Sequence, residues 1–166
     1  MSALSYRLHK SGVPAPDFGV FGPFGAREAL FRKFEDSTMV DGVWQKRIVR
    51  GPATYEAWLA SWRVFRCACL HLGVASLASL EEYESGMEVL VKLYPNAWGH
   101  LYISDTMMRT EQWRTLMLNI SIGLHKPKSE FEAARPWDYV IRATSYGSEE
   151  GVYRHWWETR VVLPLS

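Results

Sequence analysis

The spacing of apolar and polar positions changes along this chain, and each change marks an element. Apolar residues recur at helical spacing through YEAWLASWRVFRCACLHL, residues 55–72, and form one broad stripe. Gly51 and Pro52 precede this segment and Gly73 follows it, as expected at the two ends of a helix. We therefore expect a helix over residues 55–72, with Trp58 and Trp62 anchoring a core.

A β-hairpin is predicted before this helix. Residues 29–39 and 43–49 flank Asp41-Gly42, which is a strong signal for a two-residue turn. Strand alternation divides the second segment into two faces. One face carries Val43, Gln45, Arg47 and Val49, and the other carries Trp44, Lys46, Ile48 and Arg50. Neither face is wholly apolar, so we expect one of them to be solvated.

The rest of the chain predicts further helices. Ser79 and Glu82 have capping-box spacing and predict a helix that runs to Tyr94. Asn96 is placed to cap a third helix from residue 97, which either breaks near Thr110 or continues to residue 123. Further along, the sequence predicts a polar linker at 125–133, a fourth helix at 136–146, and a last helix at 149–160, capped by Ser148 and stopped by Pro164.

These elements predict a mainly α protein of α+β type, a helical bundle of about four to five helices with one β-hairpin. Residues 1–27 read as an extended aromatic arm. Residues 28–166 read as a single domain, with the hairpin in 28–50 and the helical body in 54–166. Because Phe18, Phe21 and Phe24 lie among turn residues, we expect the arm to pack on the body or on a neighbouring chain.

Composition adds one pointer to function. Aromatic residues make up 14% of the chain, and tryptophan and tyrosine are enriched at protein interfaces as well as in cores. The candidate protein-interface residues are Phe18, Phe21, Phe24 and Trp156. The formal net charge is only +1, so strong bulk attraction to nucleic acid or membrane is not expected.

The two cysteines, Cys67 and Cys69, lie two positions apart on the predicted tryptophan-rich helix, where they point to different faces. A disulfide between them is not expected, which favours a reducing intracellular compartment, cytoplasmic or nuclear. Together with His71 they are the nearest approach to a metal cluster, but structural zinc sites join pairs from separate segments. We expect buried apolar cysteines, no cofactor, and no membrane partner, since no apolar run is long enough to span a bilayer.

No catalytic motif stands out. The glycine series at Gly19, Gly22 and Gly25 matches no phosphate-binding loop. An enzyme built from dispersed residues, around His100, Asp105 and His155, stays open as an alternative. The pair Asp105 and Arg109 has the helical spacing of an ordinary solvated surface contact.

Basic and aromatic residues mix around the hairpin. Phosphate contact combined with stacking is how single-stranded nucleic acid is held. Glu35, Asp36 and Asp41 lie in the same stretch and favour a plain solvated face instead. The candidate nucleic-acid-binding residues are Arg32, Lys33, Trp44, Lys46, Arg47 and Arg50.

Four strings support a resemblance: DFGVFGPFGAR, GPATYEAWLASWRVFRCACLHLG, YPNAWGHLYISDTMMRTEQW and FEAARPWDYVIRATSYG. Through them the chain resembles a helical region that recurs in repeat-rich protist genomes and is associated with retroelements. The resemblance implies a Gag-like assembly role and carries over no activity or site residue. Because the chain has no C-x-x-C zinc knuckle, the resemblance implies a capsid portion alone.

The leading functional hypothesis is therefore a non-enzymatic helical module that self-associates or binds a protein partner. Its basis is the aromatic content, the phenylalanine-rich arm and the resemblance. A nucleic-acid-binding protein that uses the hairpin face is the second hypothesis, and the dispersed-site enzyme is the third.

Overall fold

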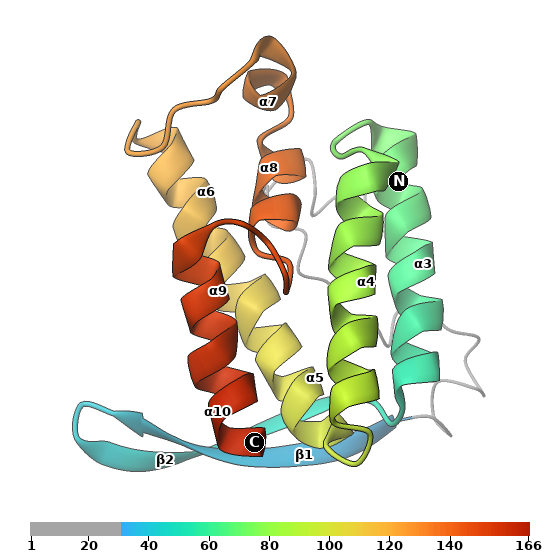
Figure 1. Ribbon diagram of the computed structural model, residues 1–166, viewed down its shortest axis with the longest axis vertical. Helices are drawn as coiled ribbons and strands as arrows, with labels where there is room; N and C mark the ends of the chain where they lie inside the picture. Colours follow the sequence, from blue (N-terminus) through green and yellow to red (C-terminus); the bar gives the residue numbers. More distant parts are fainter. Residues whose placement is uncertain (1–30) are drawn as a thin grey trace.

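The computed structural model describes residues 31–166, which form a mainly helical bundle with one antiparallel hairpin across one end (Figure 1). The predicted fold class is confirmed, while the predicted arm, residues 1–27, lies outside the described residues. The elements are β1 (Phe31–Val40), β2 (Val43–Pro52), α3 (Tyr55–Leu72), α4 (Leu77–Leu93), α5 (Trp98–Met107), α6 (Trp113–Ser121), α7 (Glu130–Ala134), α8 (Pro136–Ala143), α9 (Gly151–Trp157) and α10 (Leu163–Leu165). Two π-helical turns, η2 (Met108–Gln112) and η3 (Glu158–Val162), join α5 to α6 and α9 to α10.

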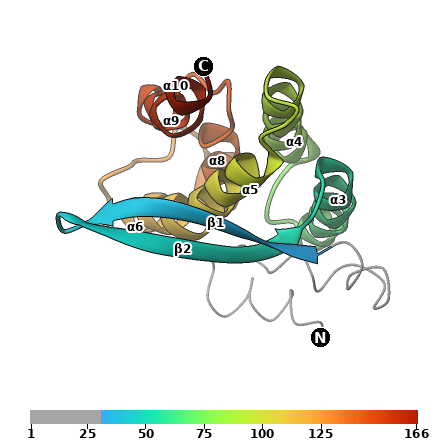
Figure 2. The same ribbon diagram turned by 90° about the horizontal axis from the view of Figure 1, so that it is seen from below.

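The hairpin forms around the predicted turn. Asp41 and Gly42 have φ of 50° and 79°, both in the left-handed region that a tight two-residue turn requires. Val40 pairs with Val43, and pairing continues without a bulge to Phe31 and Pro52. The ribbon lies across one end of the helices, as the view from below shows (Figure 2).

Helix α3 matches its prediction at both ends. The Thr54 hydroxyl accepts from the backbone N–H of Ala57, and Gly73 ends the helix at φ 68°. The apolar stripe includes Trp58 and Trp62, both fully buried. Burial of two such large side chains stabilises the core by several kcal/mol, at roughly 25 cal/mol per Å² of apolar surface.

Helix α4 begins earlier than predicted. Its N-cap residue is Ser76 rather than the predicted Ser79. The Ser76 hydroxyl accepts a hydrogen bond from the backbone N–H of Ser79. Asp138 of α8 holds the cap by accepting from both the backbone N–H and the hydroxyl of Ser76, at 2.7 and 2.6 Å. The capping-box pattern was misleading because Ser79 lies buried inside the helix.

The third predicted helix does not break near Thr110. It runs from α5 through the π-helical turn η2 into α6, so the alternative of continuation is the correct one. Most of α7 lies within the predicted linker at 125–133, and Ser129 caps this helix by accepting from the N–H of Glu132. Helix α8 ends at Ala143, earlier than predicted. Helix α9 begins at Gly151, and its N-cap residue is Glu150 rather than the predicted Ser148.

Pro164 does not stop the last helix. It lies inside α10, which continues α9 through the turn η3. Proline supplies no N–H to the carbonyl four residues earlier, which is that of Arg160. The ring of His100 donates to this carbonyl instead, with Nε2 2.8 Å from the oxygen. A side chain from α5 thus replaces the missing backbone donor.

A stacked aromatic cluster fills the centre of the bundle. Trp62 stacks on Trp58 at 5.3 Å and on Tyr83 at 4.9 Å between ring centroids. Trp113 of α6 meets Tyr83 edge-on at 5.6 Å. These contacts join α3, α4 and α6, and packing in this cluster accounts for three of the eight tryptophans.

Candidate functional site

The hairpin register separates its side chains onto two faces. Side chains directly opposite each other share a face, so Phe34 lies with Val49, and Lys33 lies with Arg50. The Phe34 ring is buried at 5.6 Å from the ring of Tyr102 on α5. The face that carries Phe34 is therefore the inner face, turned to the helices, and the face that carries Lys33 is the outer face.

The inner face is fixed to α5 by close contacts. Phe34 lies directly over Gly99, where a Cβ would be 3.0 Å from its ring. Gly51 approaches the Tyr102 ring, and the Trp98 indole donates to the Pro52 carbonyl at 2.8 Å. An isolated two-stranded ribbon is marginal in water, so this packing holds the hairpin in shape.

Two of the six predicted nucleic-acid-binding residues lie on the inner face. Arg47 forms an ion pair with Glu111 of η2 at 2.7 Å. The Arg32 guanidinium lies 4.5 Å from the centre of the Phe34 ring. Both cations make contacts within the chain, so the six candidates do not form one surface.

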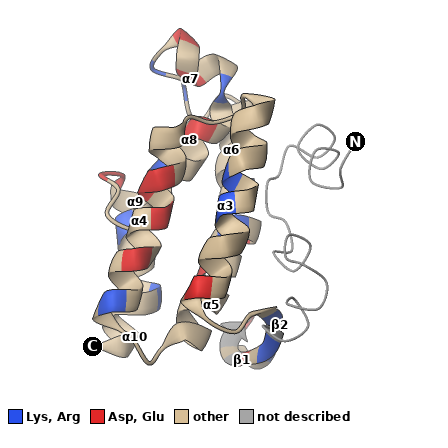
Figure 3. Cartoon of the chain, turned by 90° about the vertical axis from the view of Figure 1, so that its right-hand side faces the viewer, with Lys and Arg blue, Asp and Glu red and all other residues tan. Residues whose placement is uncertain are grey.

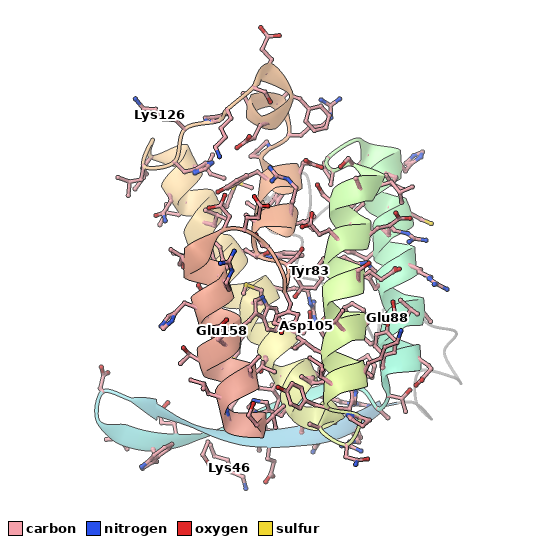
Figure 4. All side chains as sticks on the ribbon, in the orientation of Figure 1. Lys46, Tyr83, Glu88, Asp105, Lys126 and Glu158 are labelled. Carbon is pink, nitrogen blue, oxygen red and sulfur yellow. The ribbon has the colours of Figure 1, made fainter. Side chains whose placement is uncertain are left out.

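The other four share the outer face. Trp44 is 66% exposed and Ile48 is 57% exposed, so these two side chains form an apolar patch on the outer face. Lys33, Lys46 and Arg50 are exposed on the same face. Lys46 pairs with Glu35 at 3.1 Å and points away from the helices (Figure 4). Ile48 was missing from the predicted set, although strand alternation already placed it beside Trp44. We call these five residues, Lys33, Trp44, Lys46, Ile48 and Arg50, the hairpin outer surface.

The predicted protein-interface residues are only partly described. Phe18, Phe21 and Phe24 lie outside the described residues. Trp156 is half-buried and meets Trp157 edge-on at 5.0 Å between ring centroids. Packing against the core therefore covers part of the Trp156 side chain.

A buried polar centre lies inside the aromatic cluster. Asp105 and Arg109 are 0% and 2% exposed, with the guanidinium 2.9 Å from the carboxylate. The Trp58 indole donates to Oδ2 of Asp105 at 3.0 Å, and the Tyr83 hydroxyl donates to Oδ1 at 2.7 Å. The expectation of a solvated Asp105–Arg109 pair is wrong, because helical spacing does not tell which way the shared face points.

The electrostatics of this centre are those of a structural pair. Burial raises the pKa of Tyr83 well above its usual range, and the Asp105 carboxylate raises it further. Burial opposes the charge on Arg109, but attraction to Asp105 outweighs it and raises the pKa of the guanidinium. Both carboxylate oxygens accept protein donors, so Asp105 is occupied in holding α3, α4 and α5 together (Figure 4).

The residues of the dispersed-site alternative do not converge. Asp105 is enclosed in the core, while His100 donates to the Arg160 carbonyl near the end of the last helix. His155 is exposed on α9 beside Thr159, at 3.4 Å. The structure gives these three residues separate surroundings rather than a common cleft.

The cysteines differ from the expectation that both are buried. Cys69 is buried, which raises the pKa of its thiol to about 12, but Cys67 is exposed because it lies on the opposite side of α3. Within residues 31–166, no group of three or more potential metal ligands comes together.

A small hollow lies at the other end of the bundle. It has a volume of about 60 Å³ and is lined by Ile120, His125, Glu132 and Tyr139, among others. His125 stacks on the Tyr139 ring at 4.1 Å and approaches Glu132 at 3.3 Å. These contacts fasten the connection between α6 and α7 to α8.

Comparisons with models of protein families, with curated proteins and with solved structures found no match for this chain. Among the helices that the structure describes, none is long and apolar enough to cross a membrane.

Proposed function

We propose that this protein is a helical assembly module that binds other protein chains, its own copies included, through the hairpin outer surface. The observation that carries this proposal is Trp44, which is 66% exposed on a ribbon whose inner face is fixed to α5. Exposed tryptophans on a preorganised surface are typical centres of binding energy. Ile48 on the same face adds apolar area.

The charged residues around this patch support a protein partner. Lys33, Lys46 and Arg50 surround the two apolar side chains, and Glu35 is the carboxylate paired with Lys46. An apolar centre with a charged rim is the usual anatomy of a protein interface. The resemblance to a retroelement-associated helical region supports self-assembly as the form of binding, in a capsid-like part of a mobile-element protein.

Sedimentation of the full chain over a range of concentrations tests this function. The proposal expects larger species as the concentration rises, and their loss in a Trp44→Ala, Ile48→Ser double variant. Val152→Ser on α9 is the matched control, because Val152 is 74% exposed but lies far from the hairpin in sequence. A wild-type chain that remains a monomer and recovers no protein partner would refute the proposal.

Single-stranded nucleic acid is the second candidate partner. The observation in its favour is that Lys33, Lys46 and Arg50 share one face with Trp44. Such binding should weaken steeply as salt is raised, because phosphate contacts release counterions. Anisotropy of a labelled oligonucleotide measures this, and unchanged binding in a Lys33→Ala, Lys46→Ala variant would remove the candidate.

A further inference from the structure

We infer that the apolar and basic surface at the end of α6 binds an acidic, amphipathic segment of a different protein. This inference goes beyond the proposed function, because the surface lies at the opposite end of the bundle from the hairpin (Figure 1). Three features of the molecule carry it. They are aliphatic side chains that protrude, a backbone that holds them in place, and cations that pair with no carboxylate within residues 31–166.

Three aliphatic side chains protrude where α6 ends. Leu118 and Ile122 are about one turn apart and are 56% and 61% exposed. Leu124, two residues further on, is 75% exposed. Side chains exposed to this degree stand out from the surface rather than line a groove, and none of the three lines the hollow beside His125. They are therefore placed to insert among the apolar side chains of a partner.

The backbone at the end of α6 holds these side chains in place. Gly123 has φ 83°, and its N–H donates to the carbonyl of Ile120. The N–H of Leu124 donates to the carbonyl of Asn119 at 2.9 Å. These two hydrogen bonds form a Schellman motif, whose usual apolar contact joins the positions of Leu124 and Leu118. A surface fixed in this way loses little conformational entropy on binding.

Cations surround the aliphatic side chains. Arg114 precedes Leu118 by one turn on the same face of α6, and Lys126 and Lys128 follow Leu124 in the connection to α7. All three cations are exposed. An apolar centre with a charged rim is the usual anatomy of a protein interface. We call Leu118, Ile122 and Leu124, together with these three cations, the α6 tip.

The cations of the α6 tip are available to a partner. No ion pair within residues 31–166 includes Arg114, Lys126 or Lys128. On α3 and α4, by contrast, charges of opposite sign pair within the chain, as Arg66 does with Glu84 (Figure 3). Carboxylates of a second protein would therefore meet three unpaired cations beside an apolar patch. Such complementarity speeds the encounter and fixes its orientation.

Three other occupants fit the α6 tip less well. A second α6 tip would bring the same positive charge against it. Nucleic acid held by stacking needs free aromatic faces, but the Arg135 guanidinium lies 4.6 Å from the centre of the Phe131 ring on α7. An anionic bilayer would press on Glu130, an exposed carboxylate at the start of α7, the outermost helix of this end (Figure 1). A short acidic segment reaches Leu124 and leaves Glu130 in water.

Fluorescence anisotropy of three labelled peptides tests this inference on the full chain. The acidic peptide has about 15 residues, with leucine at every third or fourth position and glutamate and alanine between. Lysine replaces each glutamate in the second peptide, and serine replaces each leucine in the third. The acidic peptide should bind with a Kd in the micromolar range. The other two should bind at least about ten-fold more weakly, because each lacks one half of the complementarity.

Two variants of the chain locate the binding site. The first carries Ile122→Ser and Leu124→Ser, and the second carries Lys126→Glu and Lys128→Glu. All four side chains are exposed, so both variants should fold, which circular dichroism and thermal melts check. Each variant should bind the acidic peptide at least about ten-fold more weakly than wild type. The charge-reversed variant should instead gain affinity for the lysine peptide.

Matched controls separate the α6 tip from the rest of the surface. Val152→Ser and Arg154→Glu change exposed residues of α9 and should leave the affinity for the acidic peptide unchanged. Trp44→Ala should leave it unchanged as well, because the hairpin lies at the other end of the bundle (Figure 1). Failure of the proposed function and failure of this inference are thereby told apart.

Three results would overturn the inference. If the wild-type chain binds none of the peptides, or all three equally, an acidic segment is not the partner. If the acidic peptide binds the α6 tip variants as it binds wild type, its site lies elsewhere. If the chain sediments with vesicles of phosphatidylcholine and phosphatidylserine but does not bind the acidic peptide, and the α6 tip variants lose the vesicles, a membrane is the occupant.

Discussion

Asp105 and Arg109 form an ion pair that is closed off from solvent, with the guanidinium 2.9 Å from the carboxylate inside the aromatic cluster. A buried pair is costly to break, because removal of one partner leaves the other charge uncompensated. Trp58 and Tyr83 donate to the same carboxylate, so the pair connects three helices. The stability of the bundle should depend on it.

Asp105→Asn should therefore destabilise the protein by about 3–5 kcal/mol. The amide cannot neutralise Arg109, and its NH2 group cannot accept the hydrogen bond that Trp58 or Tyr83 donates to the carboxylate. Urea unfolding measures the loss, with Arg114→Met as an exposed control on α6. Addition of Arg109→Met should recover part of the loss, because it removes the stranded charge. A loss below about 1 kcal/mol for Asp105→Asn would contradict this role.

The contact between His100 and the Arg160 carbonyl predicts that substitutions of His100 and Pro164 have coupled effects on the free energy of unfolding. His100→Ala should cost about 1 kcal/mol, since it leaves a half-buried carbonyl without its donor. Pro164→Ala supplies a backbone N–H four residues after Arg160. The His100→Ala substitution should therefore cost less in the Pro164→Ala background. A double-mutant cycle by urea unfolding checks this, and equal costs in both backgrounds would exclude the compensation.

The close packing around Gly86 predicts that replacement of this glycine by alanine destabilises the protein. A Cβ at this position in α4 would lie 2.7 Å from the backbone oxygen of Tyr146. Alanine gains up to about 1 kcal/mol in helix propensity, but backbone crowding costs about 1–3 kcal/mol. Gly86→Ala should lower the melting temperature, whereas Ser85→Ala on the exposed side should not. A stabilised Gly86→Ala variant would show that α4 and the Tyr146 segment are less close.

Alkaline pH should destabilise this protein, because burial makes tyrosine hydroxyls and a cysteine thiol hold their protons more tightly in the folded state. Burial raises the pKa of Tyr55 and of Cys69 to about 12, and that of Tyr83 well above its usual range. Each group gives up its proton more readily in the unfolded chain. Stability is therefore full below the unfolded pKa values, near about 8.5 for a thiol and about 10 for a phenol, and falls as pH rises beyond them.

Urea unfolding at a series of pH values measures this decline. Each such group lowers the free energy of unfolding by up to about 1.4 kcal/mol per pH unit. A Cys69→Ala variant should begin to lose stability at a higher pH than wild type, because the thiol titrates first. A stability that stays constant to about pH 11 would contradict the burial of these groups.

Much of the fold follows from local sequence signals. Asp41-Gly42 predicted the turn, and Thr54 and Gly73 limit the helix that the apolar spacing indicated. Strand alternation correctly separated Trp44 and Ile48 from Arg47 and Val49. These signals succeed because they depend on residues close together in the chain.

The errors came from contacts between distant segments. The capping-box spacing indicates Ser79, but the true cap is Ser76, which is fixed by Asp138, 62 residues after Ser76 in the chain. The burial of Asp105 depends on Trp58, 47 residues before it. Pro164 is tolerated within a helix because a side chain from α5 meets the freed carbonyl. No local pattern reports such partners.

The candidate surface was predicted only in part for the same reason. Alternation gives two faces of a hairpin but does not tell which one contacts the helices. The position of Phe34 against Gly99 and Tyr102 decides this and removes Arg32 and Arg47 from the outer face.

We propose that the chain associates with its own copies through the hairpin. Light scattering behind size exclusion tests it most directly, with the full chain and its Trp44→Ala variant loaded from micromolar concentrations upward. We expect a wild-type mass that rises with concentration and a variant mass that stays close to that of one chain. A wild-type mass of one chain at every concentration, or equal association of the two proteins, would contradict it.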